Sequence, residues 1–417
     1  MRGFVWASLM VILGCGGESR EGSAAVNDAV APRHETEIHE RDSAGIRIVE
    51  SVRPVWAPGR GWRLDDEPSL VIGTEDGPPE YQFYRIGGAH RTPEGSLIVT
   101  NAGSSQIRVY DVGGRHVRAM GQRGGGPGEF HQFSGMSLWV GSNGTIHVED
   151  GANDRINAFT IDGALVRTYR LQATEQFPRA FPLAMLSNSE WLAWAPRGGG
   201  TLSGAPGSVI ESEWAYARYR ADGTWVAEVL RAAGRPRLVH QSGSLTHYPY
   251  IPLTADPLVA AAGGGFAIWI GPHPEIALRD GAGVVRTLIR WHPTRRRAVS
   301  EVWDRFARDD VERITQERDR ILYRNLYALS LPLPRDVPVI ARLLADANGN
   351  LWTEHYRLPW DTVPAWDIFN SEGHWLGELM VPRGLRLLEI GSDHVVARHR
   401  DEDGIERVQV YRLVKGP

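Results

Sequence analysis

The chain has 417 residues, of which 46 are lysine or arginine and 50 are aspartate or glutamate, giving a net charge of −4. This near balance excludes a general attraction to nucleic acid, and no nucleic-acid partner is expected. The 15 tryptophans and 12 tyrosines, with 47 glycines and 26 prolines, favour short strands joined by turns over long helices. No internal apolar run reaches the roughly 18 residues that a membrane-spanning helix needs.

The first residues have the pattern of an export signal. Met1-Arg2 is followed by the apolar stretch 4–14, which is too short for a transmembrane helix, and the only cysteine is Cys15 in "ILGCGG". This pattern resembles the lipobox of bacterial lipoproteins, which implies that 1–14 is a signal peptide and that Cys15 is lipidated. The protein would then be anchored in the cell envelope, and Gly16 after the cysteine favours the outer membrane where a cell has two. The alternative is an ordinary signal peptide with a chance cysteine.

Residues 15–44 are polar and show no periodicity, which predicts a flexible tether between the lipid and a folded body. The tether contains "HETEIH", in which His34 and His39 are five positions apart. A zinc-binding HExxH helix needs a spacing of four to place both imidazoles on one face, so this stretch predicts no metal site.

The body, residues 45–417, contains a repeated pattern of apolar strands and glycine turns. "EGSLIVTNAGSSQIRVYDVGGRHVRAMGQ" begins at Glu94, and "NGTIHVEDGANDRINAFTIDGALVRTYRL" repeats it from Asn143 with the same spacing between its turn glycines. Further copies begin at Asn188, Gly264, Asn348 and Gly391. Each copy provides three strands, and a further strand precedes each first turn. Six copies of four strands predict an all-β fold, a six-bladed β-propeller.

The last copy ends before its fourth strand. Residues 45–51, "GIRIVES", have strand character and belong to no copy. We therefore expect this N-terminal strand to complete the sixth blade beside 407–414, closing the ring and removing open sheet edges.

A helical insertion is predicted between the fourth and fifth blades, at about 296–330. Apolar residues recur there at helical spacing, and "LPLPRDVP" ends the segment because proline cannot continue a helix. The insertion is either a packed decoration of one propeller face or a lid or docking surface.

The glycine-rich stretch "GQRGGGPGEF", 121–130, lacks the GK[ST] of a phosphate-binding loop and leads into a turn and a strand. Together with "DANGNLW" (346–352) and "YRL" (411–413), it resembles the bacterial NHL-like six-bladed propeller lipoproteins. The resemblance covers roughly residues 45–415 and implies the fold. It implies little about function, because propellers host unrelated activities.

The candidate functional residues are polar side chains at predicted loops and innermost strands. Some six-bladed relatives, such as lactonases and amidating lyases, resemble this fold and hold a metal in the central channel. The candidates for such a channel or pocket are His90, Glu129, His131, His247, Glu354 and His355, and His240 and His273 lie in similar positions. "DANGN" lacks the glutamate that an EF-hand needs at its twelfth position. No GxSxG elbow supports serine hydrolysis.

The leading prediction is a non-catalytic, membrane-anchored binding module for a protein, peptide or glycan, with no cofactor. The alternative is a metal-dependent hydrolase or lyase, lactonase-like or amidating-lyase-like, with a divalent metal in the central channel. Propellers bind ligands where loops and innermost strands converge.

Overall fold

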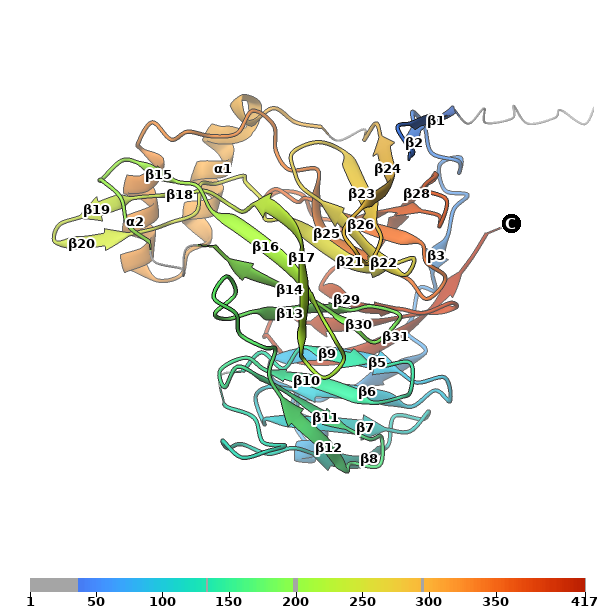
Figure 1. The fold of residues 1–417 in the computed structure, drawn as a ribbon. Helices are drawn as coiled ribbons and strands as arrows, with labels where there is room; N and C mark the ends of the chain where they lie inside the picture. Colours follow the sequence, from blue (N-terminus) through green and yellow to red (C-terminus); the bar gives the residue numbers. More distant parts are fainter. Residues whose placement is uncertain (1–36, 133, 198–201, 294–295, 417) are drawn as a thin grey trace, which may run out of the picture. The chain divides into compact units, whose positions relative to one another are not determined.

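The computed structural model describes residues 37–132, 134–197, 202–293 and 296–416. Within them, six antiparallel sheets follow one another along the chain as the blades of a β-propeller (Figure 1). The predicted signal peptide, Cys15 and residues 15–36 of the predicted tether lie outside the described residues. The predicted fold class, a six-bladed β-propeller, is confirmed.

The strands of each blade follow in chain order with the first innermost; blades one to five have four such strands, and blade six has three. Blade one has β5 (Ile86–Arg91), β6 (Leu97–Asn101), β7 (Gln106–Tyr110) and β8 (His116–Met120). Blade two has β9 (Leu138–Val140), β10 (Ile146–Asp150), β11 (Arg155–Phe159) and β12 (Leu165–Tyr169). Blade three has β13 (Phe181–Met185), β14 (Trp191–Pro196), β16 (Glu213–Tyr219) and β17 (Trp225–Ala233).

Of the remaining blades, four and six carry the additional N-terminal strands. Blade four has β21 (Leu258–Ala262), β22 (Gly265–Trp269), β23 (Glu275–Arg279) and β24 (Val285–Trp291), with β2 (Ile46–Ser51) and β1 (Ile38–Ser43) added outside. Blade five has β25 (Ile340–Ala345), β26 (Leu351–His355), β27 (Ala365–Phe369) and β28 (Trp375–Met380). Blade six has β29 (Leu385–Ile390), β30 (His394–Arg400) and β31 (Glu406–Val414), with β3 (Arg63–Leu64) and β4 (Leu70–Ile72) paired to β31.

The turn glycines read from the sequence repeat have matching backbone conformations. The first turn glycines of blades one and two, Gly95 and Gly144, have φ values of 92° and 78°, and the second, Gly114 and Gly163, have 79° and 92°, so all four are positive. Positive φ is costly for residues with a Cβ, so glycine at these positions allows tight turns between strands.

N-terminal strands do close the last blade, but the predicted segment was wrong. Residues 46–51 pair in parallel with β24 of blade four, with Val49 opposite Ile289. It is β3 and β4 that pair with β31. The outer strands β24 and β31 offer the same kind of open edge, and the alternation of polar and apolar residues does not say which edge a strand will join.

The predicted tether also ends earlier than expected. Residues 38–43, inside the predicted 15–44 segment, form β1 and pair with β2. Between β2 and β3 the chain crosses blade five, where the amides of Val55 and Trp56 donate to the carbonyls of Trp375 and Leu376 at 2.9 and 2.7 Å. Residues 38–72 therefore form a strap along blades four, five and six, hereafter the N-terminal strap.

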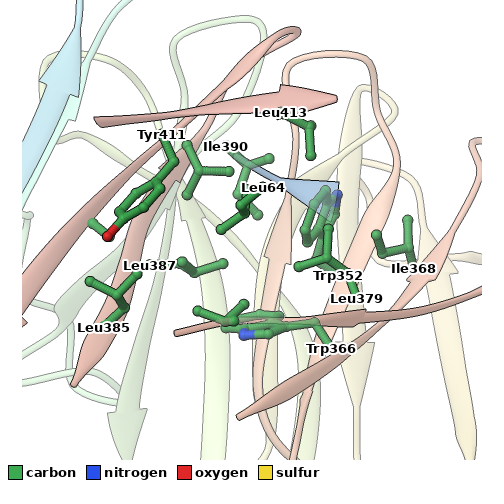
Figure 2. Close-up of a cluster of buried hydrophobic side chains, with 13 residues drawn as sticks. Leu64, Trp352, Trp366, Ile368, Leu379, Leu385, Leu387, Ile390, Tyr411 and Leu413 are labelled. Atoms are coloured by element: carbon green, nitrogen blue, oxygen red, sulfur yellow. The ribbon is translucent and has the colours of Figure 1, made fainter. Parts of the chain in front are cut away.

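Six hydrophobic clusters hold the blades together, one between each consecutive pair. Figure 2 shows the cluster between blades five and six, where Trp352 and Trp366 face Leu387, and Leu64 of the N-terminal strap joins them. The cluster that contains Ile86 and Val396 joins blade six to blade one and closes the ring. Central strands need apolar residues on both faces, because each face meets a different neighbour.

The predicted helical insertion is confirmed as α1 (Val299–Arg313) and α2 (Glu317–Tyr327), between β24 and β25. Val302 and Phe306 of α1 pack with Leu253 and Leu358, so the apolar stripe of the helix is covered. Neither helix, and no other in the described ranges, has the length and apolar character needed to cross a membrane.

The insertions gather at one end of the propeller. Because neighbouring strands are antiparallel, loops entering each innermost strand and loops joining each second strand to the third lie at the same end. This end, hereafter the insertion face, carries α1, α2, the short pair β15 (Val209–Ile210) and β18 (Arg237–Leu238), and the hairpin β19 (His240–Ser242) and β20 (Leu245–His247) (Figure 1). A single turn of 3-10 helix, Pro79–Tyr81, precedes blade one.

Candidate functional site

A cavity of about 570 Å³ opens at the insertion face between blades five and six. Its walls include four arginines and one glutamate, from both blades: Arg342 of β25, Glu354 of β26, Arg357 of the following loop, Arg386 of β29 and Arg398 of β30. Innermost strands and the ends of second strands therefore meet at this cavity. Hereafter it is the arginine pocket.

The carboxylates near the pocket only partly balance its arginines. Glu354 lies 3.5 Å from the guanidinium groups of both Arg342 and Arg357, and Glu406 lies 3.3 Å from that of Arg398. Among the described residues, Arg386 has no carboxylate within ion-pair distance. The four arginines thus outnumber the two carboxylates by two, and a bound anion would offset the remaining positive charge.

The positive charges of neighbouring arginines also repel one another, which disfavours their protonated forms. Burial lowers the pKa of Arg342 to about 10, and the nearby charge of Arg386 adds to that effect. Partial burial, followed by the charge of Arg398, likewise lowers the pKa of Arg386. Guanidinium groups keep their protons at neutral pH, so the pocket stays positively charged, and a bound anion would relieve the repulsion.

Neighbouring groups hold the arginines in position. One Arg342 nitrogen donates to the carbonyl of Leu387 at 2.6 Å, and its guanidinium lies 5.4 Å from the ring centre of Trp366. Tyr356 also lines the pocket, and burial raises the pKa of its hydroxyl, which therefore stays protonated as a potential donor. The pocket can form charge-assisted hydrogen bonds to carboxylates, and nothing in its lining acts as a nucleophile paired with a base.

A second polar group lies on the opposite face of β26. His355, Asp367 of β27 and Glu378 of β28 each present one potential ligand atom within 4.8 Å of the others. The His355 Nε2 and Asp367 Oδ2 atoms are 2.9 Å apart, and the indole of Trp375 donates to the other Asp367 oxygen at 3.0 Å. This group faces blade four, so the adjacent residues Glu354 and His355 belong to two different sites.

The other predicted candidates do not join either group. His90 Nδ1 lies 2.7 Å from Glu389 Oε2, at the end of the propeller opposite the insertion face. Burial alone would raise the pKa of Glu389, but hydrogen bonds from His394 and His90 outweigh it and hold that pKa below its usual value. The His90 pair therefore stabilises the junction of blades six and one.

Glu129 and His131 lie in the glycine-rich connection from blade one to blade two. Glu129 accepts a hydrogen bond from the amide of Gly126 at 2.7 Å, and the amide of His131 donates to Asp150 at 3.1 Å. Asn157 of blade two holds the carbonyl of Glu129 at 2.9 Å. The loop's groups are engaged by the protein itself, in agreement with a structural connection between blades.

His247 and His240 pair across the β19–β20 hairpin, with ring centres 6.5 Å apart. His273 lies before β23, where its carbonyl accepts a hydrogen bond from the indole of Trp269 at 2.7 Å. The predicted candidates thus occupy separate places, and only Glu354 lines the arginine pocket.

A larger cavity of about 650 Å³ lies near His90, between the turns of blades one and two. Its lining contains one carboxylate, Glu94, and one imidazole, His90, among turn residues. No group of like-charged side chains lines this cavity, so the arginine pocket is the better candidate for binding a charged ligand.

The arginines of the pocket were missed from the sequence, although a signal exists. Arg342 and Arg386 each begin an Arg-Leu-Leu triplet in the innermost strand of consecutive blades, in "ARLLADANGN" and "LRLLEIGSDH". The repeated triplet marks both arginines as innermost-strand residues of adjacent blades, and both side chains line the arginine pocket.

Comparisons with known proteins agree with the fold. Residues 89–200 match the DUF5128 family, described as a 6-bladed β-propeller. A search of curated proteins finds no match. The chain is similar to a DUF4221 family member from Bacteroides vulgatus, with 11% identity over 86% of this chain and 99% of that one and a TM-score of 0.48.

Two further solved structures show weaker likeness. One is a catalytically inactive virginiamycin B lyase from Staphylococcus aureus with quinupristin, which is 11% identical to this chain. The alignment covers 83% of this chain and 99% of the lyase, with a TM-score of 0.39. Regucalcin, a calcium-binding protein from Agrobacterium tumefaciens, has 11% identity, coverage of 81% and 93%, and a TM-score of 0.37. Likenesses at this level say nothing about what the present chain binds. The family description and the structure define the class of the protein, a six-bladed β-propeller.

Proposed function

We propose that this propeller is a non-catalytic binding module that holds a carboxylate-bearing ligand in the arginine pocket. The observation that carries the proposal is the convergence of Arg342, Arg357, Arg386 and Arg398 on one cavity with too few carboxylates to balance them. Arginine binds carboxylates through two parallel hydrogen bonds, and Arg386 is without an ion-pair partner among the described residues. The chemistry suits an acidic peptide or a glycan that contains uronic acids.

Isothermal titration of the full chain with triglutamate and with trigalacturonate tests the proposal. We expect one of the two to bind at one site per chain, and the Arg386→Ala substitution to weaken binding by about 10- to 100-fold, because a hydrogen bond to a charged group contributes about 1.5–3 kcal/mol. Arg220→Ala is the matched control, since Arg220 is an exposed arginine in the turn between β16 and β17. Equal loss in both variants, or binding of neither probe, would overturn the proposal.

We further propose that the module is tethered to the cell envelope through a lipid on Cys15, at the outer membrane where a cell has two. The support is the lipobox-like "ILGCGG" sequence. Two acyl chains suffice for stable anchoring, since each buried methylene contributes about 0.8 kcal/mol. The Cys15→Ser variant is expected to leave the membrane fraction of expressing bacteria, as measured by fractionation and immunoblotting. Persistence of this variant in the membrane fraction would contradict the anchor.

A further inference from the structure

We propose that His355, Asp367 and Glu378 form a divalent-metal site, suited to Zn²⁺, inside the interface between blades four and five. The site is separate from the arginine pocket, and no step of the argument depends on that pocket's ligand. It also lies away from the central channel, because its residues come from the second, third and outermost strands of one blade.

The register of blade five brings the three side chains to one face. Asp367 lies opposite Glu378 in the β27–β28 pair and opposite Thr353 in the β26–β27 pair. His355 is two residues beyond Thr353 and shares its face, because side chains alternate along a strand. The neighbouring positions, such as Trp366 and Ile368, face blade six instead.

The distances agree with a set of ligands around one small cation. The three ligand atoms lie within 4.8 Å of one another. The His355 Nε2 and Asp367 Oδ2 atoms are 2.9 Å apart, and His355 Nδ1 and Glu378 Oε2 are 3.7 Å apart. These two distances involve different nitrogens of the His355 ring, and only one nitrogen can bind a given ion. Zinc bonds of about 2.0–2.2 Å in a tetrahedron place ligand atoms about 3.3 Å apart, so a pair as wide as 4.8 Å must close by about 1.5 Å, which rotation of the partly exposed Glu378 side chain can supply.

The surroundings have the features of a site built for a cation. A cavity of about 30 Å³ adjoins His355, Asp367 and Glu378, which is room for one ion or water. The Trp375 indole fixes the second oxygen of Asp367 at 3.0 Å, as outer-shell groups fix metal ligands. Among the described residues that line this cavity, the one cation, Arg297, is engaged by Asp361 through two hydrogen bonds of 2.9 and 3.0 Å.

A buried hydroxyl provides an independent observation. Thr353 is 0% exposed, and its Oγ1 atom has no hydrogen-bond partner among the described residues. Burying a hydroxyl without a partner is costly, and its position opposite Asp367 places an additional oxygen on the face of the site. Nitrogen and carboxylate ligands, with an open position for water, suit Zn²⁺.

Zinc titration of the metal-free full chain, followed by calorimetry and by metal analysis after dialysis, tests this site. We expect one Zn²⁺ per chain, affinity that weakens in acid as protons compete for the ligand atoms, and a raised melting temperature. His355→Ala should abolish binding. Glu378→Gln, at a partly exposed position, should weaken it by at least about tenfold and keeps the test open if His355→Ala does not fold.

The half-buried histidine pair of the β19–β20 hairpin supplies the matched control, because two neighbouring imidazoles could bind zinc adventitiously. His247→Ala is expected to leave stoichiometry and affinity unchanged. Loss of zinc in His247→Ala but not in the blade-five variants would overturn the proposal, as would no binding at millimolar Zn²⁺. Arg386→Ala should bind zinc normally, so failure of the carboxylate proposal and failure of this one give different results.

Discussion

At the scale of single residues, the fold strongly shifts the pKa of His147 of β10. It is 7% exposed, its Nδ1 atom lies 3.0 Å from the Tyr169 hydroxyl, and the Trp191 ring packs against it edge-on. Burial, with a smaller contribution from the charge of Arg167, lowers the pKa of His147 from 6.5 to about 4. The folded protein therefore holds this imidazole neutral.

This shift predicts acid destabilisation with a defined range. The unfolded chain takes up a proton at His147 near pH 6.5 and the folded chain only near pH 4, so the stability is fully present above pH 6.5 and is lost as pH falls between these values. Each pKa unit corresponds to 1.36 kcal/mol, so the free energy of unfolding should fall by ~3 kcal/mol over this range. Denaturant unfolding at several pH values should show this fall in the wild type and not in His147→Gln.

The exposed His39 provides the control, and His39→Gln should keep the wild-type pH profile. A His147→Gln profile that parallels the wild type would mean that another group causes the acid sensitivity.

The candidate site shows what single residues reveal before the fold is known. Glu354 and His355 are adjacent in the sequence and were both predicted as polar residues near a pocket. The structure sends them to opposite faces of β26, one toward Arg342 and Arg398 and the other toward Asp367. Residue type identified the chemistry, but the partners come from other strands and blades, which spacing along the chain does not specify.

At the scale of elements, the N-terminal strap joins three blades. Arg47 of β2 donates to the carbonyl of Glu372 at 2.9 Å, and Glu40 of β1 lies 2.6 Å from His374, so blade four's added strands also contact blade five. The hydroxyl of Ser51, which is buried, accepts a hydrogen bond from the amide of Trp375 at 3.1 Å. The strap thus contributes tertiary contacts as well as strands.

A charged residue at a buried position of the strap tests whether its packing against the blades, beyond its strand pairing, contributes to stability. Val49 is 0% exposed, and Val49→Asp would bury an unpaired carboxylate, at a cost of about 3 kcal/mol or more in the free energy of unfolding. Arg41→Asp, on the exposed strand β1, is the control and should change stability by less than about 0.5 kcal/mol. Denaturant midpoints measure both, and equal midpoints for the two variants would show that the strap contributes no buried contact.

The strands that close blade six show why the sequence did not predict which strands pair. Residues 63–72 read "RLDDEPSLVI", in which charges and a proline interrupt the apolar residues. They form two strands of two and three residues, too short for an alternating pattern. Residues 46–51 have the clearer pattern, yet they join blade four. The pattern predicts a strand, and the connecting length and the available edges decide its neighbour.

At the scale of the whole molecule, the repeat predicted the blade number because each copy builds one sheet and each sheet needs two neighbours to bury its faces. The arginine pocket did not follow from the repeat. Its residues come from blades five and six and meet only when these blades pack side by side. The helices were predictable from their apolar spacing, while their packing against Leu253 and Leu358 depends on loops of two blades.

The pairing of β31 with β3 and β4 sets a condition on biosynthesis. Ser69 and Val410, joined by a hydrogen bond from hydroxyl to carbonyl, are 341 positions apart in the chain. The strands β3 and β4 must therefore remain unpaired until β31 has been translated. Contacts across such a separation form late because the intervening chain must first be ordered. A nascent chain with five finished sheets still has an open gap in the ring, which closes only after β31 has left the ribosome.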